Sequence, residues 1–447
     1  MSPEPINKAP SKILVVGGGY VGMYTVLRLQ RRLRKQIKSG EVVITVVDPQ
    51  PYMTYQPFLP EAAAGSLEPR HVVVPLRKVL KRAVVLSGRV TKVEHARKTA
   101  TVERLEGGSL EVPYDVIVMA PGSVARTLPI PGLSDVGIGF KTVGEAIYLR
   151  NHVLTRLDVA GSTEDPALRK RALTFVVIGG GYAGIEAFAE LEDMARDSLR
   201  YHPTLTADDM RWVLVEASQR ILPEVSAPMG VYTADVLRKR NMDLRLQTRV
   251  ESLTDGHVEL SDGEKFESDT IIWTAGVKPN PVLGKTDLTI DDRGRLVCLA
   301  NLSVKDMAGA FSGGDCAAVP DKTKDDPDAL CGPSAQHAVR QAKVLADNIV
   351  RLLAGKPMED YEHAYAGSVA SLGLGKGVAE VYGIRLKGWP AWAMHRAYHM
   401  SRVPTFNRKV RVVADWSLAL FFHRESVSLG ALQDPRSEFI RASQPPS

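Results

Sequence analysis

Residues 13–22 read Ile-Leu-Val-Val-Gly-Gly-Gly-Tyr-Val-Gly, four apolar residues followed by glycines that include positions 17, 19 and 22. This spacing is G-x-G-x-x-G at the end of a short buried strand. The first glycine permits a tight turn, the second lets a pyrophosphate touch the backbone, and the third lets a helix pack closely on the sheet. The positive N-terminus of that helix then faces the phosphates. The stretch therefore predicts a strand–turn–helix unit that binds a dinucleotide.

The strand expected at residues 41–48 ends in Asp48, where a carboxylate can bind a ribose. It follows Gly22 by 26 residues, later than the usual ~20, because a long helix rich in Arg and Lys lies between them. The unit then repeats. Residues 175–184 read Phe-Val-Val-Ile-Gly-Gly-Gly-Tyr-Ala-Gly, a helix is expected at 185–196, and the strand at 212–216 ends in Glu216. The repeat predicts two dinucleotide-binding units, each of which binds one of two cofactors.

Glu216 indicates which nucleotide the second unit binds. A carboxylate there accepts hydrogen bonds from the 2′- and 3′-hydroxyls of adenosine ribose and repels a 2′-phosphate. No Arg follows it immediately, and Arg220 stands four residues away. NADH is therefore favoured over NADPH. A third motif, Ala-Phe-Ser-Gly-Gly-Asp at residues 310–315, places Asp315 after a glycine turn, which suits either a carboxylate bonded to a flavin ribityl hydroxyl or an ordinary Asx turn.

The remaining segments fit an α/β protein. We expect strands or short helices at 72–79 and 84–93, a hairpin of 99–103 and 109–112, buried strands at 115–120 and 270–275, and a small strand cluster at 250–266. A linker is expected at 129–132, a helix at 144–157 and a polar loop at 161–171.

Length and composition bound the class of protein. The 447 residues predict about three domains, and 44% apolar with 24% charged residues is typical of a globular chain with a large core. Three cysteines without a C-x-x-C pair indicate neither a disulfide framework nor a dithiol redox pair, which fits a reducing cytoplasm. Residues 1–10 lack the features of a signal or transit peptide. No uncharged apolar run approaches the ~18 residues of a transmembrane helix.

The net charge of +6 belongs to one segment, residues 385–424, which holds eight Lys or Arg and one acid. This local charge argues against a broad nucleic-acid surface. Three of the five tryptophans lie at 389–416, and residues 410–424 predict an amphipathic helix with Arg411 and Asp415 opposite its apolar face. That face holds Val410, Val413, Ala414, Trp416, Leu418, Leu420 and Phe421. The pattern suits a helix in the interface of an anionic membrane, and a helix packed on the core or in a dimer would look similar.

Together these motifs resemble those of the type II NADH dehydrogenases, the single-subunit NADH:quinone oxidoreductases of the two-dinucleotide-binding flavoprotein superfamily. The resemblance covers nearly the whole chain and rests on residues 17–22, 52–65, 114–122, 179–186, 273–279 and 313–315. Residues 335–341, Ala-Gln-His-Ala-Val-Arg-Gln, match the family's A-Q-x-A-x-Q at Ala335, Gln336 and Ala338, whereas the second Gln follows Ala338 by three positions. In the family this helix start lies under the flavin ring and borders the quinone pocket.

The resemblance implies that the first unit and Asp315 hold FAD non-covalently and that the second unit holds NADH. The implied FAD contacts are Gly17, Gly18, Gly19, Tyr20, Val21, Gly22, Asp48 and Asp315, the implied NADH contacts are Gly179, Gly181, Tyr182, Gly184 and Glu216, and Gly122, Gly276 and Ala335 are further cofactor contacts. Glu186, Gln336 and Gln341 are the implied catalytic residues, with Glu186 near the flavin–nicotinamide contact. Tyr182-Ala183 stands where family members commonly have Pro-Thr.

The cysteines and histidines bear on two other kinds of site, a sulfur-transfer site and a metal site. Sulfide:quinone oxidoreductases carry sulfur on cysteines that flank the flavin. Cys298, Cys316 and Cys331 all fall late in the chain, so we expect them to be small buried residues. No metal site is expected, and histidines 337, 395 and 399 are expected to be core or surface residues. A proton relay to quinone is an alternative for histidine 337.

The sequence thus predicts an α/β fold with two Rossmann-like dinucleotide-binding domains, for FAD and NADH, and a C-terminal helical membrane-associating segment. The expected boundaries are 1–125 and 283–370 for FAD, 126–282 for NADH and 371–447 for the membrane region. The expected function is hydride transfer from NADH to FAD and two-electron reduction of menaquinone or ubiquinone, without proton pumping, at the cytoplasmic face of the cell membrane. The anionic lipid surface is expected to meet 385–424, and a homodimer is compatible with the sequence. The alternatives are a soluble NADH-dependent flavoprotein oxidase or reductase and a non-catalytic flavoprotein sensor or scaffold.

Overall fold

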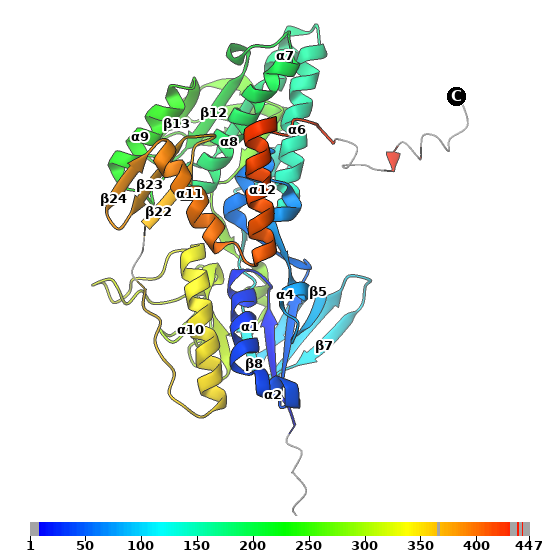
Figure 1. Cartoon of the computed structure of the whole chain (residues 1–447), viewed down its shortest axis with the longest axis vertical. Helices are drawn as coiled ribbons and strands as arrows, with labels where there is room; N and C mark the ends of the chain where they lie inside the picture. Colours follow the sequence, from blue (N-terminus) through cyan, green and yellow to red (C-terminus); the bar gives the residue numbers. More distant parts are fainter. Residues whose placement is uncertain (1–8, 364–366, 430–435, 438–439, 441–447) are drawn as a thin grey trace, which may run out of the picture. The chain divides into compact units, whose positions relative to one another are not determined.

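The computed structural model describes residues 9–363, 367–429, 436, 437 and 440. The chain forms two compact units, the first from residues 1–54, 74–124 and 277–365, and the second from residues 55–73, 125–276 and 366–447. Figure 1 shows the elements of both. Each unit is assembled from segments that are far apart in the sequence. Most of the N-terminal stretch 1–10 and most of the end of the expected 371–447 region lie outside the described residues.

The first unit is built on a seven-stranded sheet with the order β20-β8-β1-β2-β5-β6-β7. Its parallel part comprises β1 (Ser11–Val16), β2 (Val42–Asp48), β5 (Val84–Glu94), β8 (Val116–Met119) and β20 (Ala310–Ser312). The apolar side chains of β1 and β8 are buried, as expected for central strands of a parallel sheet. β6 (Thr99–Arg104) and β7 (Ser109–Pro113) pair as the antiparallel hairpin that the glycine pair between them predicts.

Two helices of the first unit pack against each other, α1 (Tyr20–Arg32) and α10 (Ala335–Leu353) (Figure 1). Arg28 donates to both carboxylate oxygens of Asp347 at 2.8 and 2.5 Å, and the Thr25 hydroxyl donates to the carbonyl of Ala342 at 3.3 Å. The remaining elements wholly in this unit are α2 (Arg34–Ser39), β3 (Tyr52–Thr54), α4 (Leu76–Val79), β18 (Val277–Pro279), β19 (Leu296–Val297) and β21 (Ala317–Ala318). β4 (Val73–Pro75) and β9 (Ser123–Ala125) stand where the chain passes from one unit to the other.

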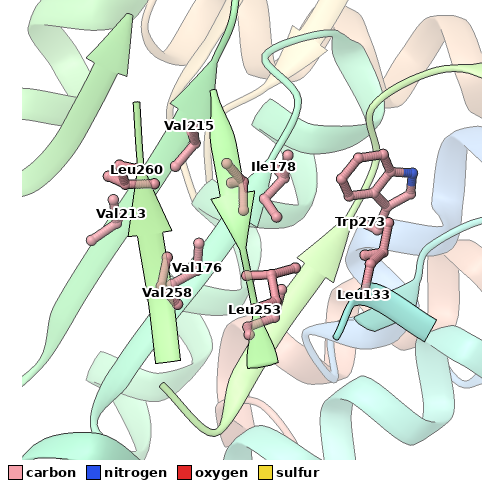
Figure 2. Close-up of a cluster of buried hydrophobic side chains, with 11 residues drawn as sticks. Leu133, Val176, Ile178, Val213, Val215, Leu253, Val258, Leu260 and Trp273 are labelled. Atoms are coloured by element: carbon pink, nitrogen blue, oxygen red, sulfur yellow. The ribbon is translucent and has the colours of Figure 1, made fainter. Parts of the chain in front are cut away.

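The second unit contains a five-stranded parallel sheet with the order β10-β17-β11-β12-β13. These strands are β10 (Gly137–Gly139), β11 (Thr174–Ile178), β12 (Arg211–Glu216), β13 (Met242–Leu246) and β17 (Thr270–Trp273). A small antiparallel sheet of β14 (Val250–Ser252), β15 (His257–Leu260) and β16 (Lys265–Glu267) packs on it. Figure 2 shows the buried side chains where the two sheets meet, among them Val176, Val213, Val258 and Leu260. The strand–turn–helix pattern of the first unit thus recurs with its own core.

The helix between the linker and β11 is longer than predicted, and the loop after it is shorter. α6 (Val143–Ser162) begins with a capping box, because Thr142 accepts from the backbone N–H of Glu145 while the Glu145 carboxylate accepts from that of Thr142. The polar loop expected at 161–171 is wrong, since α7 (Pro166–Ala172) occupies most of it. Asp165 accepts from the backbone N–H of Ala167 at 2.8 Å and Pro166 takes the first helical position, which together start a helix.

The C-terminal part of the second unit is a three-stranded antiparallel sheet followed by two helices, α11 (Trp389–Arg402) and α12 (Phe406–Phe422). The strands are β22 (Gly367–Ser371), β23 (Gly377–Val381) and β24 (Ile384–Lys387). The other helices of this unit are α3 (Leu59–Ala63), α5 (Leu133–Val136), α8 (Tyr182–Ser198) and α9 (Ala227–Arg238). The helix predicted at 410–424 begins earlier and ends at Phe422, so Arg424, which the prediction included, lies beyond it. Among the described residues, no helix is long and apolar enough to cross a membrane.

Candidate functional site

The first glycine turn has the geometry that a pyrophosphate requires. Gly17 has a φ of +97°, and a Cβ there would lie 2.2 Å from the carbonyl oxygen of Ala120. A Cβ on Gly22 would lie 1.8 Å from the carbonyl oxygen of Gly17, so only glycine lets the helix approach. A Cβ on Gly19 would meet nothing within 4 Å. The N-terminus of α1 carries no side-chain cap and no acid in its first turn, which fits an anion bound there.

Asp48 is fixed beside this turn at the end of β2. Its Oδ2 accepts from the backbone N–H of Gly18 at 2.6 Å and its Oδ1 from that of Gln50 at 2.7 Å. Burial raises the pKa of Asp48, and the two backbone hydrogen bonds oppose that rise. The carboxylate therefore lies within hydrogen-bonding distance of the glycine turn, as a ribose-binding group should.

The other predicted flavin contacts converge on the same turn. Gly122 has a φ of +68° with open space around it, and the Ser123 hydroxyl donates to Oδ2 of Asp315 at 2.6 Å. A Cβ on Gly314 would lie 2.9 Å from a methyl group of Val21, in the first turn of α1. The structure thus brings together segments near residues 20, 122 and 315, which the sequence separates widely.

The start of α10 lies at the same place. Ala335 is the first helical residue, and Ser334 caps the helix by accepting from the backbone N–H of residue 337 at 3.1 Å. Gln341 is buried, and its side-chain oxygen accepts from the backbone N–H of Gly314 at 2.7 Å. This hydrogen bond joins Gln341 to the turn that carries Asp315. Gln336 is half-buried, and its side-chain oxygen accepts from Arg340 at 3.3 Å.

The second glycine turn repeats the first. Gly179 has a φ of +113°, and a Cβ on Gly184 would lie 1.9 Å from the carbonyl oxygen of Gly179. Glu216 accepts from the backbone N–H of Gly180 at 2.6 Å and from that of Ser218 at 2.7 Å. This is the arrangement of Asp48 with Gly18 and Gln50 in the first unit. The N-terminus of α8, which begins at Tyr182, also lacks a side-chain cap and an acid in its first turn.

Two carboxylates and one guanidinium group lie around this second turn. The Arg220 guanidinium donates to the carbonyls of Val225 at 2.9 Å and Pro223 at 2.6 Å, which holds it on its own loop. A Cβ on Gly181 would have only Oε1 of Glu224 within 4 Å, at 3.8 Å. Burial raises the pKa of Glu224, and the charge of Glu216 adds to that rise. Gly276, with a φ of +90°, has open space around it.

Glu186, in the second turn of α8, belongs to a buried polar cluster. Its Oε1 accepts from the backbone N–H of Ser371 at 2.9 Å and lies 3.2 Å from Nε2 of His395. Burial lowers the pKa of His395, but the adjacent Glu186 outweighs that effect, so the net shift is upward. Glu61 and Glu190 lie in the same cluster, each 1% exposed. The sequence prediction missed them, although Glu186 and Glu190 at i, i+4 within an apolar helix were a detectable signal.

The cysteines behave as small buried residues, as predicted. Cys298, Cys316 and Cys331 are buried and free. Burial raises the pKa of all three thiols, that of Cys331 to about 11, which keeps them protonated at neutral pH. Across the described ranges, no group of three His, Cys, Asp or Glu is arranged to hold a metal ion. His337 is buried, with Nδ1 2.8 Å from the Tyr361 hydroxyl.

The apolar stripe of α12 faces outward. Leu420 is 67% exposed and Phe421 80%, while Val412 on the inner face is fully buried. Trp416 was expected on the outer stripe, but its Nε1 donates inward to Oε2 of Glu61 at 2.6 Å. Asp415, predicted opposite the stripe, indeed faces inward. Its Oδ2 lies 2.6 Å from Nδ1 of a histidine, residue 71.

Two of the basic residues counted for the charged segment are not on the surface. The side chain of Arg396 is 10% exposed and donates to Glu61 at 3.0 Å. That of Arg424 is 7% exposed and donates to Asp193 at 2.6 Å. These two guanidinium groups therefore neutralise buried carboxylates and do not contribute to the exposed charge of 385–424.

Known proteins share this sequence pattern and fold. A family model described as pyridine nucleotide-disulphide oxidoreductase matches residues 11–342. A type II NADH:quinone oxidoreductase of Staphylococcus aureus is 29% identical over 392 residues, covering 86% of this chain and 93% of that one. The type II NADH:quinone oxidoreductase Ndh of Mycobacterium tuberculosis is 25% identical over 443 residues, covering 95% and 92%. The structure of NDH2 from Plasmodium falciparum in complex with NADH matches with a TM-score of 0.85 and 17% identity, covering 93% and 99%. The fold class is thereby confirmed.

Proposed function

This chain belongs to the pyridine nucleotide-disulphide oxidoreductase family, and on that premise we propose that it oxidises NADH and reduces a membrane quinone, with FAD as its cofactor. The observation that carries the proposal is the pair of uncapped helix N-termini, each with a carboxylate bound to its glycine turn. The relatives of similar length from Staphylococcus aureus and Mycobacterium tuberculosis are named for this reaction.

The residues of the first unit fit the adenosine and ribityl parts of FAD. The open space at Gly19 and the uncapped start of α1 suit a pyrophosphate, and Asp48 suits the ribose. Asp315, held by Ser123, would bind the ribityl chain, and Gln341 would hold the turn that carries it. When bound, FAD supplies the chemistry of accepting a hydride and passing on two electrons. Gln336, at the start of α10, would border the acceptor.

The second unit would hold NADH. Gly181 and the start of α8 would meet the pyrophosphate, and Glu216 would accept hydrogen bonds from the ribose hydroxyls. NADPH is disfavoured because Glu216 and Glu224 both lie at this turn, while Arg220 is tied to backbone carbonyls of its own loop. Glu186, one turn into the same helix, would lie near the nicotinamide.

Membrane attachment would be peripheral, through α12 at the cytoplasmic face. Exposed Leu420, Phe421 and Phe422 follow one another at its end, and Arg402 and Arg411, both exposed, lie at the end of α11 and in the first half of α12. Two helices that expose both apolar side chains and cations suit an anionic lipid surface. A second copy of this chain could cover the same stripe, which would make a homodimer. The outward stripe supports a lipid-dissolved acceptor over the soluble oxidase, and the protonated, buried thiols disfavour sulfur transfer.

Steady-state turnover of the purified holoprotein tests the function. NADH or NADPH would be supplied with a menaquinone or ubiquinone analogue in anionic vesicles, with oxygen alone, or with a soluble dye. We expect NADH with a quinone to give the fastest turnover, and oxygen alone to give little. Equal rates with oxygen and quinone would support the soluble oxidase. Absence of turnover with every acceptor would support the non-catalytic sensor or scaffold.

A further inference from the structure

Two segments of the first unit are rich in Lys and Arg and contain no acid. No Asp or Glu occurs at residues 5–40 or 69–93. The first of these segments includes the end of α1 and all of α2, and the second includes α4 and the turn after it (Figure 1). Seven of their cations are exposed and form neither an ion pair nor a side-chain hydrogen bond within the described part of the chain: Arg31, Arg34, Lys35, Lys38, Lys78, Lys81 and Arg82. We call these seven residues the basic surface.

The two segments lie side by side because Gln30 joins them. Its side-chain nitrogen donates to the carbonyl of Val79 at 3.5 Å, and its side-chain oxygen accepts from the backbone N–H of Arg82 at 2.6 Å. Gln30 is itself buried, in the last turn of α1. The cations of α1 and α2 and those of residues 78–82 therefore form one surface of the first unit.

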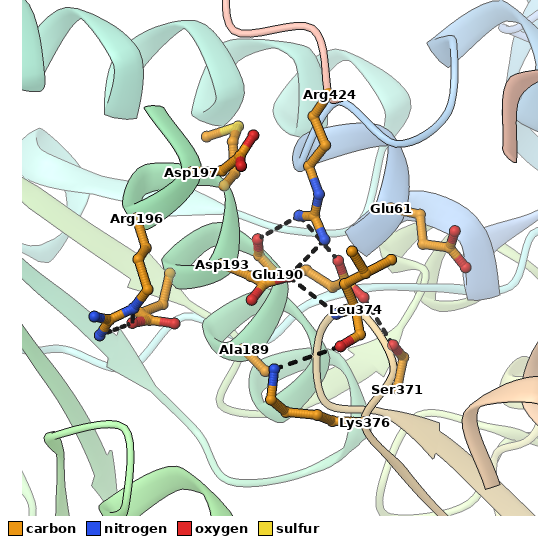
Figure 3. A network of polar contacts seen from close by, with 12 residues as sticks. Glu61, Ala189, Glu190, Asp193, Arg196, Asp197, Ser371, Leu374, Lys376 and Arg424 are labelled. Atoms are coloured by element: carbon orange, nitrogen blue, oxygen red, sulfur yellow. Dashed lines mark hydrogen bonds and ion pairs between the residues drawn. The ribbon is translucent and has the colours of Figure 1, made fainter. Parts of the chain in front are cut away.

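Other cations of the chain are matched by acids, which the basic surface lacks. Arg32, next to it on α1, lies 3.4 Å from a carboxylate oxygen of Asp347. In the second unit, Arg424 reaches a carboxylate oxygen of Asp193 at 2.6 Å, within the polar network that Figure 3 shows. The basic surface is thus a concentration of positive charge that the described part of the chain does not neutralise.

Helix dipoles account for only part of this charge. A cation in the last turn of a helix is stabilised by the negative end of the dipole, which suits Arg31, Lys38 and Lys78. Arg34 and Lys35 stand in the first turn of α2, where the dipole disfavours them, and the last two cations of the set lie in no helix. Arg34 and Lys38 also stand at i, i+4, where like charges repel. An anion bound at the surface would relieve both effects.

The basic surface lacks the side chains around which a protein interface forms. Such interfaces are centred on buried aromatic and apolar anchors. Residues 31–40 and 77–83 contain no aromatic residue, and their two leucines, Leu33 and Leu80, are buried. An acidic protein would therefore meet only peripheral charge here, which affects the rate of association more than the affinity.

A bilayer that contains anionic lipids matches this surface better. Its negative surface potential attracts each nearby Lys or Arg and needs no aromatic anchor. Single-stranded nucleic acid is held by stacking of its bases on aromatic side chains, which are absent here. The chain also exposes an apolar stripe on α12, with Leu420 and Phe421, which suits lipid. Double-stranded nucleic acid, which can bind to cations alone, is the competing occupant.

We propose that the basic surface binds an anionic lipid bilayer, by attraction of headgroup phosphates and carboxylates to its cations and without insertion of side chains. This contact belongs to the first unit and is additional to the stripe of α12 in the second. The proposal rests on the proposed function, because an acceptor that is dissolved in lipid requires the protein to stay at the membrane.

Reversing the charge of α2 tests the proposal. The variant is Arg34→Glu with Lys35→Glu and Lys38→Glu, and co-sedimentation would measure binding of the holoprotein to vesicles of phosphatidylcholine and phosphatidylglycerol in equal parts. Binding should weaken by at least about tenfold at low salt, since each such cation contributes about fivefold. Wild type and variant should converge at about 1 M salt, where the screening length is about 3 Å. The variant should stay folded, because acids suit the first turn of a helix, and its flavin content and urea unfolding check this.

A second variant and a matched control show whether position or net charge decides the binding. Lys81→Glu with Arg82→Glu reverses the other half of the basic surface and should also weaken binding to the mixed vesicles. The control, Lys285→Glu with Arg293→Glu and Lys305→Glu, changes the net charge as much as the α2 variant does, at exposed cations elsewhere in the first unit. It should bind these vesicles nearly as well as the wild type. Vesicles of phosphatidylcholine alone should not distinguish any of the proteins.

Each outcome decides between the occupants. If both variants of the basic surface bind the mixed vesicles as tightly as the wild type, or if the control loses as much binding as they do, the proposal is overturned. Tighter binding of the wild type to a DNA duplex than to the mixed vesicles at the same salt, lost in the α2 variant, would assign the surface to nucleic acid instead. Turnover with a water-soluble quinone is measured separately. If the wild type reduces no quinone, the proposed function fails, whereas the vesicle comparison still decides the lipid contact.

Discussion

At the residue scale, the nucleotide choice that we propose depends on a carboxylate that is fixed by the backbone it faces. Glu216 binds the N–H groups of Gly180 and Ser218, so its position is set before any nucleotide arrives. Preorganisation of this kind keeps the ordering cost of binding low. The same geometry at Asp48 shows that one local solution serves both units.

Replacing this carboxylate and adding a cation should exchange the nucleotide preference. In Glu216→Gln with Ala217→Arg, the affinity for NADH should fall by at least about tenfold, since a charge-assisted hydrogen bond contributes about 1.5–3 kcal/mol. NADPH should bind more tightly than in the wild type, because the 2′-phosphate loses a repulsion and gains a cation. Dissociation constants from fluorescence titration measure both. A double variant that still prefers NADH to the same degree would show that Glu216 does not select the nucleotide.

The raised pKa of His395 should appear in the stability of the protein. Because its pKa is higher in the folded chain than the usual ~6.5, the folded state binds more protons in that range, and this contribution to stability is present at lower pH and lost as pH rises through the folded pKa. Urea unfolding of the wild type and of His395→Gln between about pH 6 and 8.5 should therefore show that the stability of the wild type relative to the variant falls as pH rises. Histidines with a lowered pKa, such as His337, contribute the opposite slope to both proteins, so the difference isolates His395. An identical slope in the variant would contradict the assignment.

The structure agrees best with the sequence where the prediction concerned local backbone geometry. The positions of Gly17 and Gly22 in the turn could be predicted because close backbone contacts require glycine at this spacing. Glu61, Glu190 and His395 were not, because their cluster joins segments separated by up to some 330 positions, and nothing local marks them as neighbours. Gln341 was named from a motif, and its buried contact with Gly314 could be seen only in three dimensions.

At the element scale, α12 is a helix whose polar and aromatic anchors point inward. Val412, Asp415 and Trp416 attach it to the second unit, while Leu418, Leu420 and Phe421 are exposed. The periodicity predicted a two-faced helix. It could not tell which face packs on the protein, because Asp415 and Trp416 find partners in Pro69–Val72 and α3, far away in sequence.

Charging the exposed stripe should detach the protein from membranes without harming its chemistry. In Leu420→Glu with Phe421→Glu, binding to anionic vesicles should weaken by at least about tenfold, since burial of each such side chain contributes about 1.5–3 kcal/mol. Turnover with a soluble dye should be unchanged, while turnover with vesicle-bound quinone should fall. Leu105→Glu, at an equally exposed leucine of the first unit, is the control and should bind vesicles normally. A shift from dimer to monomer with normal vesicle binding would instead assign the stripe to a second copy.

The start of α6 should contribute measurably to stability. Thr142→Ala removes the hydroxyl that accepts from the backbone N–H of Glu145 and should lower the free energy of unfolding by about 1 kcal/mol. Denaturant unfolding measures the change, with an unaltered dependence on denaturant concentration. A change near zero would mean that water caps this helix equally well. The missed helix α7 shows the same principle, because the Asp-Pro pair at 165–166 was a start signal that a polar composition obscured.

At the scale of the whole molecule, each unit is discontinuous. The first unit combines the N-terminal glycine turn with the Asp315 turn and α10 from late in the chain, and the second combines residues 55–73 and the C-terminal helices with the repeat of that turn. The doubled motif predicted two dinucleotide units and an α/β fold. Grouping of 55–73 with the C-terminal helices was not predicted, because it arises from buried pairs such as Glu61 with Arg396.

The central claim is that two nucleotide units in one chain carry electrons from NADH through FAD to a quinone. Anaerobic rapid mixing of the holoprotein tests it most directly. NADH should bleach the flavin absorbance, with one NADH consumed per flavin, and a menaquinone or ubiquinone analogue added next should restore the absorbance within the turnover time. A flavin that NADH does not bleach, or that recovers its absorbance with oxygen but not with any quinone, would contradict the account.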